Sequence, residues 1–158
     1  MKILGPSLQR QSECEAVLRS LPKWFGIEES LMEYVADTGQ KPTFAIESDG
    51  KVVAFLSLHE HFPESWEVHC IAVHADFRGK GQGSHLLAHA EDWLRGRGAK
   101  LLQIKTIAET KNDPYYAETR AFYLAKGYTP VEVFTTIWQP WNPALQLIKI
   151  LGDSKSVA

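Results

Sequence analysis

Three glycines occupy alternate positions between Arg78 and Ser84, in the sequence Arg-Gly-Lys-Gly-Gln-Gly-Ser. Glycine lets a backbone turn tightly and come close to a ligand. If a helix begins here, its unpaired amides and the positive end of its dipole favour an anion. Arg78 and Lys80 add positive charge at the same place. The segment therefore predicts a binding site for a diphosphate, although a loop that only caps a helix could carry the same glycines.

A second group of candidate residues precedes the glycines. Glu67 and His69 are two residues apart in a strand-like segment, so their side chains share a face. A carboxylate and an imidazole in this position can take up a proton or hold a water that does so. Each residue taken alone could also be a strand-edge residue with a satisfied hydrogen bond. His85 and His89 lack a carboxylate at the spacing of a zinc site, so the sequence predicts no metal.

The elements that position these residues are predicted by the spacing of apolar residues. A buried strand over residues 66–73 leads into the glycines, and a helix follows them. The pair Asp49-Gly50 predicts a tight hairpin between two earlier strands. The expected helices are 11–21, 28–35, 84–95 and 116–126, and the expected strands are 43–47, 52–58, 66–73, 101–107, 128–138 and 145–151. This order predicts a mixed sheet flanked by helices. The two leading helices and the glycine spacing do not match a dinucleotide fold or a nucleoside triphosphate loop.

Composition narrows the class of protein. The 158 residues, with 44% hydrophobic and 23% charged side chains, predict one soluble domain over residues 1–158. A net charge of -2 gives no basic surplus for nucleic acid. Two cysteines, Cys14 and Cys70, are too few for a disulfide framework, so a reducing cytoplasm is expected. The sequence also predicts no export signal and no membrane segment, because no apolar run approaches about 20 residues.

The motif Arg78-x-x-Gly81-x-Gly83 resembles the acyl-CoA signature Gln/Arg-x-x-Gly-x-Gly/Ala of the GCN5-related N-acetyltransferase (GNAT) superfamily. The strand before it matches as well, and residues 121–128 are similar to the second conserved helix of that family. The resemblance implies an α+β fold with a mixed, mainly antiparallel sheet of six to seven strands and about four helices. It also implies an enzyme that moves the acetyl group of acetyl-CoA, as a co-substrate, directly onto a primary amine.

The resemblance further implies which residues contact the donor. The amides expected to hold the pyrophosphate are those of Arg78, Gly79, Lys80, Gly81, Gln82, Gly83 and Ser84. The pantetheine arm is expected to pair with the backbone of Ile71, Ala72 and Val73. Tyr116 stands where an asparagine often contacts the cofactor, and Asn112 is the nearby alternative. Tyr123 stands where the family has a tyrosine near the cofactor sulfur, which assigns it to cofactor binding and to protonation of the leaving thiolate. A packed core tyrosine is the other interpretation of Tyr123.

The implied reaction requires a base, since a free alkylammonium has a pKa of about 10.4 and only the neutral amine attacks. Glu67 is the first choice for this base, with His69 beside it. A backbone amide near residues 71–73 is the expected donor to the oxyanion. Trp24, Phe25 and His59 are expected to border the acceptor site. A hydrophobic plug is the alternative for the two aromatic residues, and a solvated strand end is the alternative for the histidine.

Other functions remain open on the sequence alone. A CoA-binding sensor or partner module without turnover would keep the glycine segment, and so would an enzyme that transfers another acyl group. The expected partner is a small-molecule or peptide amine, with no nucleic acid and no membrane, and its identity is not fixed by the fold. A homodimer is a further possibility, because an exposed last strand would offer an edge for pairing.

Overall fold

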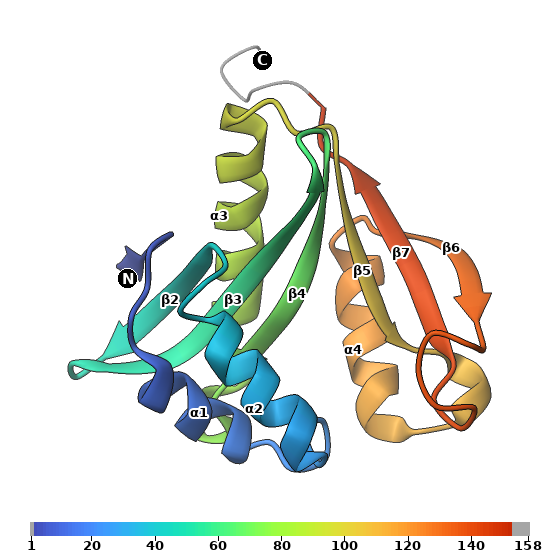
Figure 1. Cartoon of the computed structure of the whole chain (residues 1–158), viewed down its shortest axis with the longest axis horizontal. Coiled ribbons are helices and arrows are strands. Elements are labelled where there is room, and N and C mark those ends of the chain that lie inside the picture. The colour runs from blue at the N-terminus through green and yellow to red at the C-terminus, as the bar shows by residue number, and fades with distance from the viewer. Residues whose placement is uncertain (1, 153–158) are drawn as a thin grey trace.

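The chain forms one seven-stranded sheet with helices on both faces (Figure 1). The computed structural model describes residues 2–152. The strands lie in the order β1-β2-β3-β4-β5-β7-β6. They are β1 (Ile3–Leu4), β2 (Thr43–Ser48), β3 (Lys51–Phe62), β4 (Ser65–Val73), β5 (Leu101–Ile107), β6 (Thr129–Phe134) and β7 (Ala144–Ile150). The helices are α1 (Gln11–Arg19), α2 (Glu28–Asp37), α3 (Gln82–Gly96) and α4 (Pro114–Ala125), with 3-10 turns at Ala75–Phe77 and Glu109–Lys111.

The sheet divides between β4 and β5, the one parallel pair among the described strands. Helix α3 makes the crossover that a parallel pair requires. The pairing covers three positions, from Ser65 opposite Leu101 to Glu67 opposite Gln103. Beyond these positions the strands diverge, as Figure 1 shows. One arm of the molecule then contains β2 to β4 with α1 to α3, and the other contains β5 to β7 with α4.

A β-bulge at His69 redirects β4 just after it leaves β5. In the register with β3, Ser57 pairs with Cys70 and Leu58 with Val68, so His69 has no partner. Because side chains alternate along a strand, one extra residue exchanges the two faces. Val68 accordingly lies in the core that contains α3, whereas Cys70 lies in the core that contains α1 and α2. Because of the bulge, β4 contributes side chains to both cores.

A buried carboxylate joins the two arms near the closed end of the sheet. Glu91 in α3 accepts a hydrogen bond from the Tyr128 hydroxyl at 2.7 Å and another from the Lys149 ammonium at 3.0 Å. The Glu91 side chain is only 7% exposed. Removing one partner of a buried ion pair costs about 3–5 kcal/mol, so this contact fixes α3 against β7.

The expected fold class and the expected helices and strands are confirmed, with ends that differ by a few residues. The hairpin is confirmed as well, because Asp49 and Gly50 have φ values of 52° and 78°, as a two-residue turn needs. The strand expected to reach residue 138 ends at Phe134, because β7 begins only after Pro143, which has no amide to pair.

Two further features of the sheet differ from the sequence prediction. The last strand was expected at the edge, but β7 lies between β5 and β6, and β6 is the edge strand. The two-residue strand β1 was not expected, because so short a segment has no apolar pattern. None of the helices within residues 2–152 combines the length and the apolar character that crossing a bilayer needs.

Candidate functional site

A cavity of about 700 Å³ lies where β4 and β5 separate. Residues 68–73 of β4 and 104–107 of β5 form its two strand walls. Helix α2 and its connection to α1, the segment at the start of α3, helix α4 and the β6–β7 connection complete the lining. Ligand sites favour such concave, largely apolar places. This cavity is therefore the candidate site, and each residue that the sequence singled out can be placed relative to it.

The glycine segment lies at the start of α3, where Arg78 and Gly83 line the cavity. Gly79 and Gly81 both have a φ of +79°, and Gly81 is the N-cap of α3. This φ is in the left-handed region, which glycine adopts without strain. Among the described residues, no acceptor takes a hydrogen bond from the amides of residues 78–84. These amides are thus available to an anion.

The side chains of this segment have different environments. Gln82 is 8% exposed, and its Oε1 has no hydrogen-bond partner within residues 2–152. A Cβ added to Gly83 would lie 3.5 Å from the Phe122 ring, which is ordinary contact. Lys80 lies 5.6 Å from the centre of the Phe77 ring, and Ser84 is half-buried.

Arg78 extends from the glycine segment toward the opposite side of the cavity. Its guanidinium lies 4.4 Å from the centre of the Trp24 ring and 3.8 Å from Oε2 of Glu118 in α4. The indole Nε1 of Trp24 donates a hydrogen bond to Thr119 Oγ1 at 3.2 Å. The α1–α2 connection is thereby held against α4, across the separation of the two arms.

Tyr116 takes part in the same bridge. It lines the cavity, and its hydroxyl donates to the backbone carbonyl of Trp24 at 3.0 Å. Asn112, the alternative cofactor contact, is exposed at the end of the second 3-10 turn and lies outside the lining of this cavity. Contact of either residue with a cofactor stays a prediction.

Tyr123 lines the cavity from α4 and is 3% exposed. Its ring packs edge-on against Phe122 and Tyr128, at centroid distances of 5.2 and 5.8 Å. Burial, and to a smaller extent the nearby Cys70, raises the pKa of Tyr123 above its ordinary value. The side chain thus fits both interpretations, a core tyrosine and a proton donor, and the hydroxyl is the protonated form.

His69 lines the cavity from the bulge in β4. Its Nε2 lies 2.8 Å from Oδ2 of Asp37, the last residue of α2. The Tyr34 ring lies edge-on at 5.2 Å. If Nε2 carries the proton that this hydrogen bond uses, Nδ1 is left to accept a proton from a ligand. The site therefore has an imidazole held by a carboxylate, an arrangement suited to a base.

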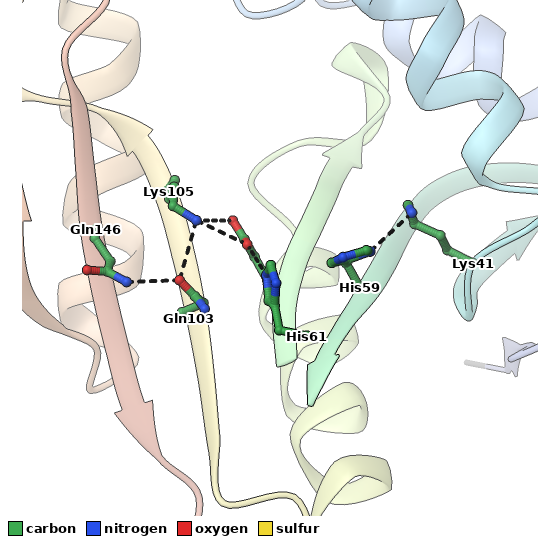
Figure 2. A network of polar contacts seen from close by, with 7 residues as sticks. Lys41, His59, His61, Gln103, Lys105 and Gln146 are labelled. Carbon is green, nitrogen blue, oxygen red and sulfur yellow. Dashed lines mark hydrogen bonds and ion pairs between the residues drawn. The ribbon is translucent and has the colours of Figure 1, made fainter. Parts of the chain in front are cut away.

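Glu67 lies on the same side of β4 but outside the cavity lining. Lys105 Nζ donates to both of its carboxylate oxygens, at 3.1 and 3.2 Å, and His61 Nε2 lies 2.7 Å from Oε1. Figure 2 shows Lys105 beside Gln103 on β5, with Gln146 on β7 adjoining them. These contacts tie β4 to β5 at the point where they part.

His59 also lies outside the cavity lining. Its Nδ1 accepts a hydrogen bond from Lys41 Nζ at 3.2 Å (Figure 2), and its ring centre lies 4.7 Å from that of His61 and 6.4 Å from that of His69. Partial burial, and then the charge of Lys41, lowers the pKa of His59. By contrast Trp24 and Phe25, the other expected acceptor contacts, line the cavity.

Two other kinds of chemistry, nucleophilic catalysis by a cysteine and catalysis by a bound metal, find little support among the described residues. Burial raises the pKa of the Cys70 thiol well above its ordinary value, which disfavours the thiolate that a nucleophile requires. The residues that the structure describes contain no group of three or more histidine, cysteine or carboxylate side chains placed to hold a metal ion.

Sequence reasoning missed Asp37, Tyr34 and Lys105. Asp37 and Tyr34 belong to an ordinary amphipathic helix, and nothing in its pattern points to His69, which lies 32 residues from Asp37. Lys105 carried a signal, because it alternates with Gln103 along a mostly apolar strand and so shares a face with it.

Comparisons with known proteins agree with this geometry. The acetyltransferase (GNAT) family matches residues 12–127. The aminoalkylphosphonate N-acetyltransferase of Salmonella typhimurium is 34% identical over 85 residues, which are 51% of this chain and 51% of that protein. The chain thus spans about half the length of this curated relative.

Solved structures show the same fold. A protein assigned to the GNAT family of acetyltransferases from Desulfovibrio desulfuricans has a TM-score of 0.82 at 18% identity, over 96% of this chain and 99% of that one. An aminoglycoside 6'-N-acetyltransferase complexed with coenzyme A has a TM-score of 0.74 at 18% identity, over 96% and 98%. Because the family match extends over most of the sequence and over both strand walls of the cavity, the chain belongs to the acetyltransferase (GNAT) family.

Proposed function

We propose that this chain is an acetyl-CoA-dependent N-acetyltransferase that binds donor and acceptor amine together between its two arms. One observation carries the proposal: a single cavity is bounded by the start of the glycine segment, by the Tyr123 ring and by the His69 imidazole. The names of the relatives, which act on aminoalkylphosphonate and aminoglycoside, support an amine as acceptor.

The donor would bind with its diphosphate at the glycine segment and its pantetheine arm along β4. Its diphosphate would accept hydrogen bonds from the amides of residues 78–84, aided by the dipole of α3. In the register of the described strands, β4 has no β5 partner past Glu67. The backbone of Ile71, Ala72 and Val73 can therefore pair with the pantetheine arm, and one amide near them would donate to the oxyanion.

The amine nitrogen would attack the thioester carbonyl carbon directly. The carbon–sulfur bond then breaks, and the Tyr123 hydroxyl protonates the leaving thiolate. The proton lost by the amine passes to a base. We favour His69 as this base because it lines the cavity and is held by Asp37. Glu67 is the second candidate, since its carboxylate is occupied by Lys105 and His61.

The wider properties of the protein belong to the same proposal. One domain would cover residues 1–158, of which residue 1 and residues 153–158 lie outside the described residues. The unpaired thiols of Cys14 and Cys70 support a cytoplasmic location. A homodimer would use the edge strand β6, where Val131 and Val133 are 52% and 45% exposed.

Thiol release from acetyl-CoA, measured with a panel of amines and with mass spectrometry of the products, tests this function. We expect the wild type to release thiol in step with acetylated amine. Tyr123→Phe should lower kcat by about 10²-fold or more without weakening acetyl-CoA binding, as loss of a positioned acid does. Tyr128→Phe is the matched control, because that hydroxyl contacts Glu91 and lies outside the cavity lining. Binding of acetyl-CoA without acetylation of any amine would instead identify a CoA-binding module.

A further inference from the structure

Large apolar side chains that are exposed to solvent line the cavity from both arms of the molecule. Ile27 in the α1–α2 connection is 49% exposed, and Ile137 and Trp138 in the β6–β7 connection are 45% and 36% exposed. All three line the cavity, although they belong to different arms of the molecule. Single exposed apolar residues are ordinary, whereas a group around one opening marks a surface that a ligand covers.

Aromatic side chains continue this surface inward to the proposed base. The rings of Phe25 and Tyr34 meet edge-on at 5.9 Å, and Tyr34 lies 5.2 Å from the His69 ring. Burial raises the pKa of Tyr34 to about 12, so that its ring carries no charge at neutral pH. A path of uncharged aromatic side chains thus leads to the imidazole that would take the proton.

The charges around the cavity are already paired. The carboxylate in the lining is Glu118, which lies 3.8 Å from Arg78 at the donor end. The cation at the acceptor end is Lys105, whose ammonium is bound to Glu67 and Gln103. A second positive charge on the acceptor would find no unpaired carboxylate among the lining residues, and it would approach Lys105. A negative charge would have to displace Glu67 from Lys105.

We infer that the acceptor is a primary amine with a single positive charge and an uncharged, bulky apolar group, preferably aromatic. The inference rests on the proposed function and names its substrate class. The amine would lie at His69. Its apolar group would lie between Phe25, Ile27 and Tyr34 on one side and Ile137 and Trp138 on the other.

Matched acceptors test this inference through kcat/KM for thiol release. We expect 2-phenylethylamine to exceed ethylamine by about ten- to a hundredfold, the discrimination that burial of one ring supports. Phenylalanine adds a carboxylate to the same skeleton, and 4-(aminomethyl)phenethylamine adds a second ammonium. Both should be poorer acceptors than 2-phenylethylamine, as should 2-aminoethylphosphonate and kanamycin.

Two tryptophan variants locate the contact. Trp138→Ala should lower kcat/KM for 2-phenylethylamine about tenfold and so narrow its advantage over ethylamine. Trp141→Ala is the control, because Trp141 is 66% exposed and lies outside the cavity lining. It should change none of these values.

Several results would overturn the inference. They are a preference for kanamycin or 2-aminoethylphosphonate, equal rates with phenylethylamine and ethylamine, or no turnover of either amine by a protein that binds acetyl-CoA. In each of these cases the donor site still stands, and the proposed function stands with it where another amine of the panel is acetylated. Failure to bind acetyl-CoA at all would count against the proposed function itself.

Discussion

Replacing His69 by glutamine is expected to lower kcat by about 10²- to 10⁴-fold, the contribution of a positioned base. The affinity for acetyl-CoA should not change, because His69 is not among the residues proposed to contact the donor. The physical reason is that the amine must lose a proton as it attacks. His69 lines the cavity, and its Nε2 lies 2.8 Å from Oδ2 of Asp37, which holds the imidazole in place. Steady-state kinetics and the rate's dependence on pH measure the effect.

Two further variants separate a base from a merely structural histidine. Asp37→Asn should lower kcat less than His69→Gln, because it disturbs the orientation of the imidazole and leaves the ring in place. The pH profiles of wild type and His69→Gln should differ in their acidic limb, which the substitution removes. Glu67→Gln, two residues away on the same strand, should have a small effect. A larger loss in Glu67→Gln than in His69→Gln would transfer the role of base to Glu67.

Replacing Gly81 by glutamate is expected to abolish acetyl-CoA binding. Gly81 has a φ of +79°, and a side chain in that region adds strain of about 1–2 kcal/mol. The new carboxylate would also stand beside the amides that should hold the diphosphate, where like charges repel. A thermal-shift assay measures the loss, since a ligand at 100 times its Kd stabilises the folded state by about 2.7 kcal/mol.

Gly96→Glu is the matched control for this variant. Gly96 closes the same helix at its other end, is exposed, and has open space around the position of a Cβ. The Gly96→Glu substitution adds the same charge at a distance from the proposed anion site. Acetyl-CoA should therefore still raise the melting temperature of this variant. Equal shifts in Gly81→Glu and wild type would show that the segment is a helix cap and no cofactor site.

Much of the fold could be predicted because its signals are local. The Asp49-Gly50 turn, the helix after Gly81 and the buried strand before it each follow from spacing within a short segment. The end of β6 could not be predicted, since it depends on where β7 starts opposite it. The same holds for the edge of the sheet, because the order of strands is a property of the whole chain.

The candidate site also contains some residues that local motifs predict and others that they do not. The glycine segment and Tyr123 are carried by motifs, and the structure places both at one cavity. The bulge at His69 and its hydrogen bond to Asp37 depend on contacts between β4, β3 and α2, which no local pattern encodes. The sequence favours Glu67 over His69 as the base. The structure instead pairs Glu67 with Lys105 across the diverging strands and places His69, not Glu67, in the cavity lining.

Calorimetric titration of the wild-type protein tests whether the cavity and the glycine segment bind acetyl-CoA. We expect acetyl-CoA and CoA to bind at one site with a Kd on the order of micromolar. ATP, which lacks the pantetheine arm, should give no comparable heat. A folded protein that binds neither acetyl-CoA nor CoA, or that binds ATP equally well, would contradict the account.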